Sequence, residues 1–246
     1  MDVPFVSVSR VRDSSARASS SPAPSPNPRK RSRPIDRRRL RNEKIRDRRA
    51  RKVASQSQKA LKPIFFHKDL ANHFVRPDWV NILGLRSSVE NEVYTSFVRN
   101  KDLLNELDEQ TQDMLRRPEF YTPFDDLTMY KSAVELGQAD MHPILGGATP
   151  TDIRFFENRT EGRTPQARHA VARLVEALHR LKKRVLIQPG DLLGSANNDC
   201  LHNKDVGTIR DEKALKERWL MKTVNVRSLR DHHAHLIEGR PRIVNG

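Results

Sequence analysis

The clearest pattern of apolar positions in the chain lies between about residues 165 and 184. Its apolar residues recur at alternating spacings of four and three, which is the pattern of a helix that buries one stripe. Thr164-Pro165 comes directly before this pattern; Thr caps free amide groups, and Pro suits the first helical position. We therefore predict an amphipathic helix with its buried stripe at Ala167, Val171, Leu174, Leu178, Leu181 and Val185.

The rest of the chain after about residue 64 has weaker patterns, divided by turns that contain Pro and Gly. Leucines over residues 101–117 predict one helix, and Ala214, Leu215 and Trp219 predict another over 211–222. Residues 185–188 are the best candidate for a short strand. The predicted fold class is mainly α: a small irregular helical body over 61–246, with an extended C-terminal segment.

Residues 1–60 differ from this body in composition and charge. Residues 13–28 are mostly Ser, Ala, Pro and Arg, which cannot bury enough apolar surface to fold alone. Residues 1–60 carry 18 Lys and Arg against 5 Asp and Glu, whereas the remainder carries 28 against 26. The sequence thus predicts a long, basic, intrinsically disordered N-terminal arm, ordered only on RNA, attached to a nearly neutral body.

Fourteen of the 24 residues from 29 to 52 are Arg or Lys. A helix charged on all sides has little reason to form until anions surround it, and arginine-rich segments commonly fold on RNA. Arg outnumbers Lys in the chain, 32 to 14, and guanidinium groups bind phosphate in a forked geometry. The predicted RNA-binding residues are Arg29, Lys30, Arg31, Arg33, Arg37, Arg38, Arg39, Arg41, Lys44, Arg46, Arg48, Arg49, Arg51 and Lys52.

A second basic surface lies on the predicted helix over 165–184, mostly away from its apolar stripe. It is either an ordinary solvated face or a secondary surface that faces RNA. The residues concerned are Arg173, Arg180, Lys182, Lys183 and Arg184.

Candidate chemistry is sparse in this sequence. Neither common type of phosphate-binding glycine loop is present, and one cysteine allows no internal disulfide. Thiolate and imidazole are good zinc ligands, but the available groups lack the tight paired spacing typical of metal sites. These weak metal candidates are Cys200, His202, His232 and His235. We expect no enzyme activity, no metal and no cofactor.

A disordered polybasic arm on a small helical body resembles, in composition and layout, the lineage-specific proteins of mitochondrial ribosomes. That resemblance implies a structural component of a large ribonucleoprotein, anchored in rRNA by its arm and packed on neighbouring ribosomal proteins by its body. The alternatives are a nuclear RNA-processing or chromatin-associated factor, a ribosome-assembly factor, or an accessory subunit of a membrane complex.

The same resemblance implies a mitochondrial location, with a nuclear location as the alternative. Arg10, Arg12 and Arg17 with several Ser fit a transit peptide over about the first 25 residues, whereas Asp2 and Asp13 do not. No apolar run approaches the roughly 18 residues that span a bilayer, so no membrane insertion is expected. A small-molecule substrate is not expected either.

Overall fold

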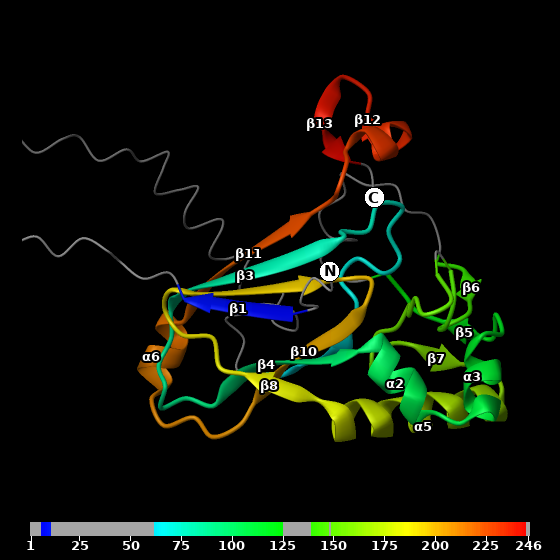
Figure 1. Ribbon diagram of the computed structural model, residues 1–246, viewed down its shortest axis with the longest axis horizontal. Coiled ribbons are helices and arrows are strands. Elements are labelled where there is room, and N and C mark those ends of the chain that lie inside the picture. The colour runs from blue at the N-terminus through cyan, green and yellow to red at the C-terminus, as the bar shows by residue number, and fades with distance from the viewer. Residues whose placement is uncertain (1–5, 11–61, 125–138, 148, 245–246) are drawn as a thin grey trace, which may run out of the picture.

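The computed structural model describes residues 6–10, 62–124, 139–147 and 149–244. Two four-stranded antiparallel sheets form its centre (Figure 1). In spatial order, the first sheet contains β1 (Val6–Arg10), β9 (Asp191–Ala196), β3 (Trp79–Arg86) and β11 (Trp219–Asn225). The second contains β2 (Ile64–His67), β10 (Cys200–Val206), β4 (Val93–Arg99) and β8 (Lys183–Val185).

The two sheets face each other, and a narrow cavity lies between them. Val80, Ile82 and Leu193 line it from the first sheet, while Thr95 and His202 line it from the second. Because side chains alternate along a strand, every second residue of these strands points into this space. The interior of the sandwich is therefore mainly apolar on the side of the first sheet, whereas the second sheet contributes Thr95 and His202 to it.

Helices cover the outer face of the second sheet. The longest is α5 (Pro165–Leu181), and the side chain of Thr164 accepts a hydrogen bond from the Ala167 amide at its start. Ala167, Leu174 and Leu178 are buried in one core with Phe66 of β2 and Leu201 of β10. This core also packs α2 (Asn100–Glu106) and α3 (Glu109–Leu115) against α5.

Short elements complete the described structure. Three two-residue strands pair beside α3: β5 (Phe120–Tyr121), β6 (Met141–His142) and β7 (Glu161–Gly162). The short helix α6 (Glu212–Glu217) leads into β11. After β11, the chain forms the 3-10 helix η1 (Arg230–His235) and a hairpin of β12 (Leu236–Ile237) and β13 (Arg240–Val244).

The prediction of a mainly α body is wrong, because two antiparallel sheets form the centre of the chain. The helix predicted over 165–184 is present as α5 but ends at Leu181, so Val185 of the predicted stripe lies in β8 instead. The one predicted over 101–117 is divided into α2 and α3, and the one over 211–222 ends at Glu217, where β11 soon begins. The predicted strand over 185–188 overlaps β8 only at Val185. Several strands escaped notice because their inward positions carry Thr, His or Lys, which hides the apolar alternation.

The segment predicted as an arm contains one described element. β1 pairs with β9 in the first sheet, from Val6 opposite Ser195 to Arg10 opposite Asp191. Residues 11–61, with all the predicted RNA-binding positions, lie outside the described residues. No helix in the described part of the chain has both the length and the apolar character needed to cross a membrane.

His142 of β6 is buried, and both its ring nitrogens have partners. Nδ1 donates to the Pro143 carbonyl at 2.9 Å, and Nε2, 2.9 Å from Thr122 Oγ1, accepts from that hydroxyl. The neutral ring satisfies both contacts, as a donor at Nδ1 and an acceptor at Nε2. Burial, the largest influence, lowers the pKa of His142 to about 4 from an ordinary value of 6.5.

The folded protein should therefore lose stability on acidification through His142. Between pH 6.5 and about 4 the unfolded chain binds this proton more tightly than the folded chain, so protonation favours unfolding by up to about 3 kcal/mol. Urea unfolding near pH 7 and near pH 4 measures the loss. His142→Asn cannot titrate in this range and should lose clearly less stability between the two pH values; an equal loss would contradict the assignment.

Candidate metal centre

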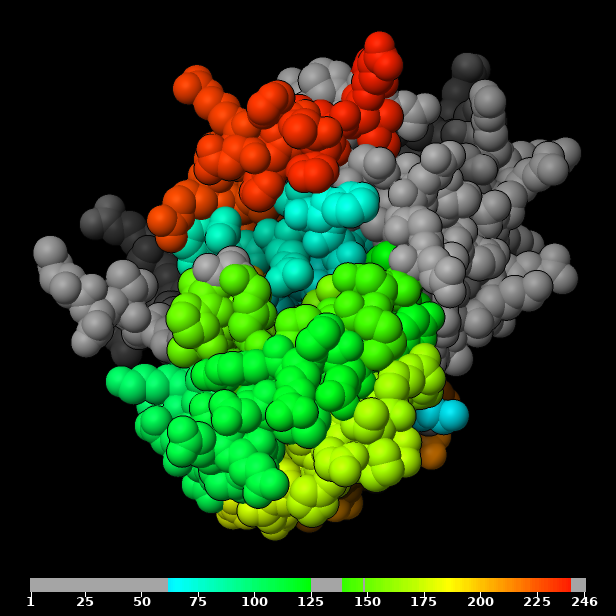
Figure 2. Space-filling model, turned by 90° about the vertical axis from the view of Figure 1, so that its right-hand side faces the viewer, coloured from blue at the N-terminus to red at the C-terminus, as the bar shows by residue number. Residues whose placement is uncertain are grey.

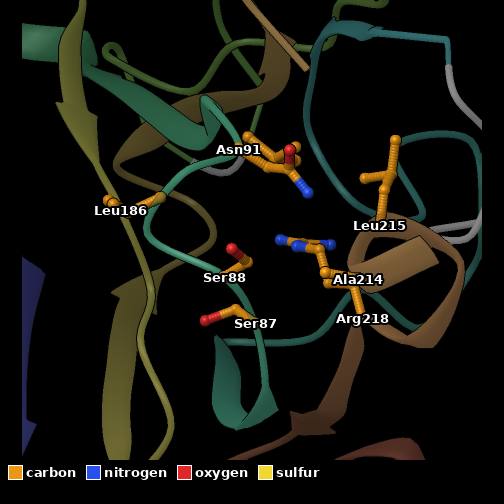
Figure 3. A pocket seen from close by; sticks show the side chains of 8 residues that line it. Ser87, Ser88, Asn91, Leu186, Ala214, Leu215 and Arg218 are labelled. Atoms are coloured by element: carbon orange, nitrogen blue, oxygen red, sulfur yellow. The ribbon is translucent and has the colours of Figure 1, made fainter. Parts of the chain in front are cut away.

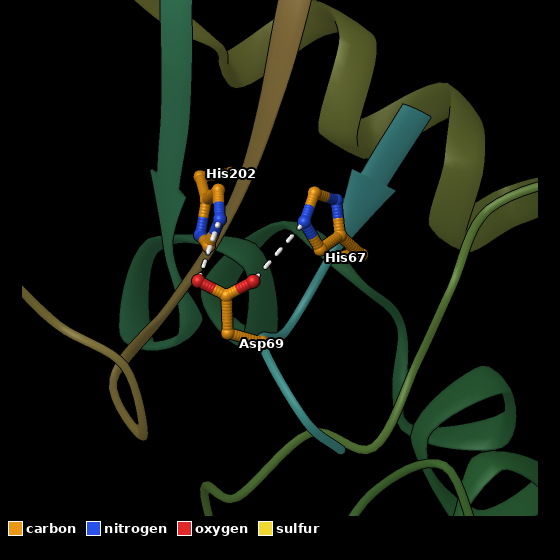
Figure 4. A group of neighbouring side chains, drawn as sticks. All are labelled: His67, Asp69 and His202. Atoms are coloured by element: carbon orange, nitrogen blue, oxygen red, sulfur yellow. Dashed lines mark ion pairs between the residues drawn. The ribbon is translucent and has the colours of Figure 1, made fainter. Parts of the chain in front are cut away.

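Three side chains from two strands and a turn come together at one edge of the sandwich. His67 ends β2, and Asp69 follows two residues later, so both side chains can point the same way from an extended backbone. His202 lies in the middle of β10 and is the direct cross-strand partner of His67. The pairing of β2 with β10 therefore brings together residues that are far apart in the sequence (Figure 4).

The three side chains could hold one metal ion. His67 Nε2 lies 3.5 Å from Asp69 Oδ1, and His202 Nε2 lies 3.5 Å from Asp69 Oδ2. One ligand atom from each residue lies within 4.8 Å of the other two. Two imidazoles and one carboxylate form the donor set typical of non-haem iron(II) oxygenases, which leaves coordination positions open.

Neighbouring groups hold these side chains in place. His67 Nδ1 contacts the Phe65 carbonyl at 2.7 Å; donation from Nδ1 leaves the lone pair on Nε2, which faces Asp69. The side chain of Asn197 bonds both the amide and the carbonyl of Asp69, each at 3.1 Å. Leu70, directly after Asp69, has a positive φ of 53°, a conformation that non-glycine residues rarely adopt. Asp69 therefore lies in a turn fixed on both sides.

The protonation states of the site suit metal binding. Burial alone would raise the pKa of Asp69, but contacts with His202, His67 and Lys222 outweigh it and hold that pKa well below its usual range. Burial lowers the pKa of His202 more than Asp69 raises it. An ionised Asp69 carboxylate beside a neutral His202 imidazole is the state in which these two groups coordinate a metal.

Two buried atoms of the site are left without a hydrogen bond among the described residues: Asp69 Oδ2 and His202 Nδ1. Lys222 Nζ lies 2.5 Å from Asp69 Oδ2 and supplies opposite charge without a well-aligned hydrogen bond. Because a buried polar atom without a partner costs free energy, the site has capacity for a ligand. When a metal ion binds, Lys222 must either share the Asp69 carboxylate with the metal or move away from it.

Two buried cations extend the site along the sandwich. Lys204 is 4% exposed and lies opposite Thr95 in the β10–β4 register. Burial, followed by the charge of Arg218, lowers the pKa of Lys204 to about 8. Arg218 is 7% exposed. Burial alone lowers the pKa of its guanidinium group, which has no hydrogen-bond or ionic partner among the described residues. Figure 3 shows its guanidinium group pointing toward Asn91 and Ser88. The unpaired guanidinium charge of Arg218 favours binding of an anion.

A separate cavity of about 630 Å³ opens beside the turn that follows Asp69. The loop with Asn72, Phe74 and Arg76 forms one wall, and Asp152 with Arg154 forms another. Figure 2 looks onto the face where the cyan loop lies between the green segment and the orange-red C-terminal segment. The volume is in the range of small-molecule sites.

Of the four metal candidates predicted from the sequence, only His202 joins the centre. Cys200 is buried two residues earlier on β10, and its thiol contacts the Ala196 carbonyl at 3.3 Å. Burial raises the pKa of this thiol to about 12, so it is a poor metal ligand. His232 lines the separate cavity, and His235 stacks on Phe74.

The predicted secondary RNA-facing residues lie on α5 and β8, and most of them form ion pairs within the chain. Arg173 pairs with Glu176, and Arg180 pairs with Glu106 and Glu176. Lys182 and Arg184 both pair with Asp205. Lys183 is an exposed residue of β8. Acidic residues of the same chain therefore neutralise much of the positive charge on this surface.

Solved structures with a similar fold are non-haem iron oxygenases. An asparagine oxygenase in complex with Fe(II), 2S,3S-3-hydroxyasparagine and succinate aligns with a TM-score of 0.64 and 24% identity, over 76% of this chain and 57% of that one. The oxygenase OrfP, in complex with Fe, succinate and (3S)-hydroxy-L-Arg, aligns with a TM-score of 0.63 and 19% identity, over 77% and 61%. OrfP in complex with Fe and alpha-ketoglutaric acid aligns with a TM-score of 0.59 and 19% identity, over 74% of this chain and 55% of that one.

These structures show the fold of the chain, which spans about three-fifths of the length of the chains it matches. No protein-family model matches the sequence. The resemblance to mitochondrial ribosomal proteins was wrong, since it rested on composition that unrelated folds share, and the matched structures are iron oxygenases.

The corresponding functional predictions are wrong as well. The matched proteins are enzymes with small-molecule ligands, which contradicts a non-enzymatic ribosomal component with rRNA and ribosomal proteins as partners and no small-molecule substrate. Neither the nuclear factor, nor the assembly factor, nor the membrane-complex subunit finds support in them. The mitochondrial location stays a prediction that no observation tests.

Sequence reasoning missed His67, Asp69, Thr95, Arg218 and Lys222. The signal for the first two was present as His67-Lys68-Asp69, which puts two ligand-type side chains on one face of an extended segment. The spacing of His202 in the sequence does not link it to this pair, because it lies far along the chain beside Cys200. The cations Arg218 and Lys222 resemble ordinary surface charges in a sequence this basic.

Proposed function

We propose that the chain is an oxygenase that depends on iron(II) and 2-oxoglutarate. The observation that carries this proposal is the convergence of His67, Asp69 and His202 beside the interior of a two-sheet sandwich. Two imidazoles and a carboxylate with open positions are the iron site of this class of enzyme. The matched structures with Fe, succinate and alpha-ketoglutaric acid support the same assignment.

The polar side chains along the sandwich interior suit the carboxylate of a dicarboxylate co-substrate, which would have to widen the narrow cavity between the sheets. Thr95 and His202 line the cavity between the sheets, Lys204 lies opposite Thr95, and Arg218 lies near Lys204. A hydroxyl and two cations would bind the distal carboxylate of 2-oxoglutarate by charge-assisted hydrogen bonds. The 2-oxo acid end would then lie toward His202 and the other two ligands.

Lys222 has a place in the same arrangement. Its ammonium contacts Asp69, so it is close enough to the metal centre to bind an anionic group of a ligand there.

Iron(II) bound by His67, Asp69 and His202 would supply the redox chemistry of the reaction. In that reaction a substrate C–H bond becomes C–OH with one atom of O₂, while the other atom enters succinate as 2-oxoglutarate loses CO₂.

Metal and co-substrate binding by the full chain tests this proposal. Under anaerobic conditions the protein should bind one Fe(II), and addition of 2-oxoglutarate should produce a visible charge-transfer absorption. On exposure to O₂, the sample should convert 2-oxoglutarate into succinate and CO₂, slowly in the absence of a substrate. Failure to bind Fe(II), or binding without any response to 2-oxoglutarate, would count against the function.

A further inference from the structure

The cavity beside the metal centre contains a carboxylate that the chain itself neutralises. Lys68 lies between the two ligands His67 and Asp69, and its side chain is 1% exposed. Its ammonium contacts Asp152 Oδ1, while Arg76 Nη1 lies 3.1 Å from Asp152 Oδ2. Both oxygens of Asp152, whose side chain is 3% exposed, are therefore engaged by cations of the protein.

The other carboxylates of the cavity wall are also engaged. Arg154 binds both oxygens of Asp140, at 2.7 and 3.5 Å. Asp78 Oδ2 accepts the Arg227 amide at 2.7 Å. Asp152 is the buried carboxylate among these three, and an ammonium group that bound it would have to compete with Lys68 and Arg76. Displacing Lys68 would leave a buried charge without compensation.

Arg76 provides the cavity with hydrogen-bond donors that are not used within the protein. Arg76 lines the cavity and is 30% exposed, the most accessible group of the Asp152 cluster. A guanidinium group has five N–H donors, and the one contact described for it is with Asp152. A planar carboxylate matches this fork in geometry and charge.

Gly147 keeps the space above Asp152 open. A β-carbon at this position would lie 3.0 Å from Asp152 Oδ2. Its φ of +135° also favours glycine. Phe74 and Phe124 line the same cavity and provide apolar surface for the remainder of a ligand.

We propose that this cavity binds an organic carboxylate that has no ammonium group beside it, with the carboxylate on Arg76, and that Lys68 determines this specificity by occupying Asp152. The inference rests on the proposed oxygenase function, because the cavity and the metal centre share the loop that follows Asp69. The proposed ligand lacks the ammonium group of the amino-acid ligands named for the matched structures, hydroxyasparagine and hydroxyarginine.

Pairs of ligands that differ only in the α-ammonium group test this specificity. The probes are 3-phenylpropanoate against L-phenylalanine, and 5-guanidinopentanoate against L-arginine, titrated into the full Fe(II)-loaded chain without O₂. The wild type should bind the deaminated acid of at least one pair about tenfold or more tightly than the amino acid. Arg76→Gln should weaken binding of that acid about tenfold.

Lys68→Met should release Asp152 and reduce the preference about tenfold or reverse it. Lys216→Met is the control, since Lys216 also pairs with an acid, Glu212, but is 70% exposed; it should change nothing. Should Lys68→Met fail to fold, Lys68→Met with Asp152→Asn removes both charges and should bind both members of a pair about equally.

Fe(II) affinity measured in the same samples separates the two proposals. Normal Fe(II) and 2-oxoglutarate binding combined with a preference for the amino acids, or with no binding of any probe, would overturn the specificity and leave the oxygenase function intact. A preference unchanged in folded Lys68→Met would overturn the role of Lys68. Loss of Fe(II) binding in the wild type would instead refute the function itself.

Discussion

Replacing His202 with alanine is expected to lower the affinity of the chain for Fe(II) by about 100-fold or more. Removal of a group that only supports a ligand typically costs 10–100-fold, and His202 is proposed as one of just three protein ligands. Formation of succinate from 2-oxoglutarate should fall to background in the same variant. Anaerobic titration with Fe(II) and quantification of succinate measure the two effects.

The matched control for this substitution is His169→Ala. His169 lies on the exposed side of α5, so its loss changes the histidine content but not the proposed centre. The two variants should have similar far-UV circular dichroism spectra, which separates loss of a ligand from loss of the fold. Fe(II) affinity retained by His202→Ala would show that the metal binds elsewhere.

Replacing Arg218 with leucine is expected to weaken co-substrate binding and, at the same time, to stabilise the ligand-free protein. Arg218→Leu should weaken binding of 2-oxoglutarate about 30-fold or more, because loss of one partner of a buried charge pair costs about 2–5 kcal/mol. The same substitution should stabilise the ligand-free protein by roughly 1–3 kcal/mol, since it removes a buried cation that has no partner among the described residues. Titration of the Fe(II)-loaded protein and urea unfolding of the ligand-free protein measure these quantities.

Arg173→Leu provides the comparison for Arg218. Arg173 is 43% exposed and pairs with Glu176 on the same helix, so its replacement should alter neither quantity appreciably. A ligand-free Arg218→Leu protein that is less stable than the wild type would mean that the guanidinium supports the fold. Unchanged affinity for 2-oxoglutarate would place the distal carboxylate away from Arg218.

Some of this protein could be predicted from its sequence, because the responsible interactions are local. The spacing of Ala167, Leu174 and Leu178 determines the buried stripe of α5, and Thr164-Pro165 determines where that helix begins. The break between α2 and α3 was missed, although Asp108 accepts a hydrogen bond from the Thr111 amide and so starts a new helix.

The sheets were harder to predict, since alternation is visible in a sequence only when one face is apolar and the other polar. In β10, the inward positions His202 and Lys204 are polar, while the outward Leu201 is buried under α5. Buried positions on both faces remove the contrast on which a period of two depends. The strand therefore resembled a polar loop.

The sequence by itself determined the helix α5, the single cysteine and the concentration of positive charge before residue 60. The tertiary structure alone decided the site. His67 meets His202 because β2 and β10 pair in antiparallel register, and Lys222 reaches Asp69 because β11 lies in the opposing sheet. Such contacts depend on strand pairing across long loops, whereas helix patterns depend on residues three and four apart, and only the latter can be read along the chain.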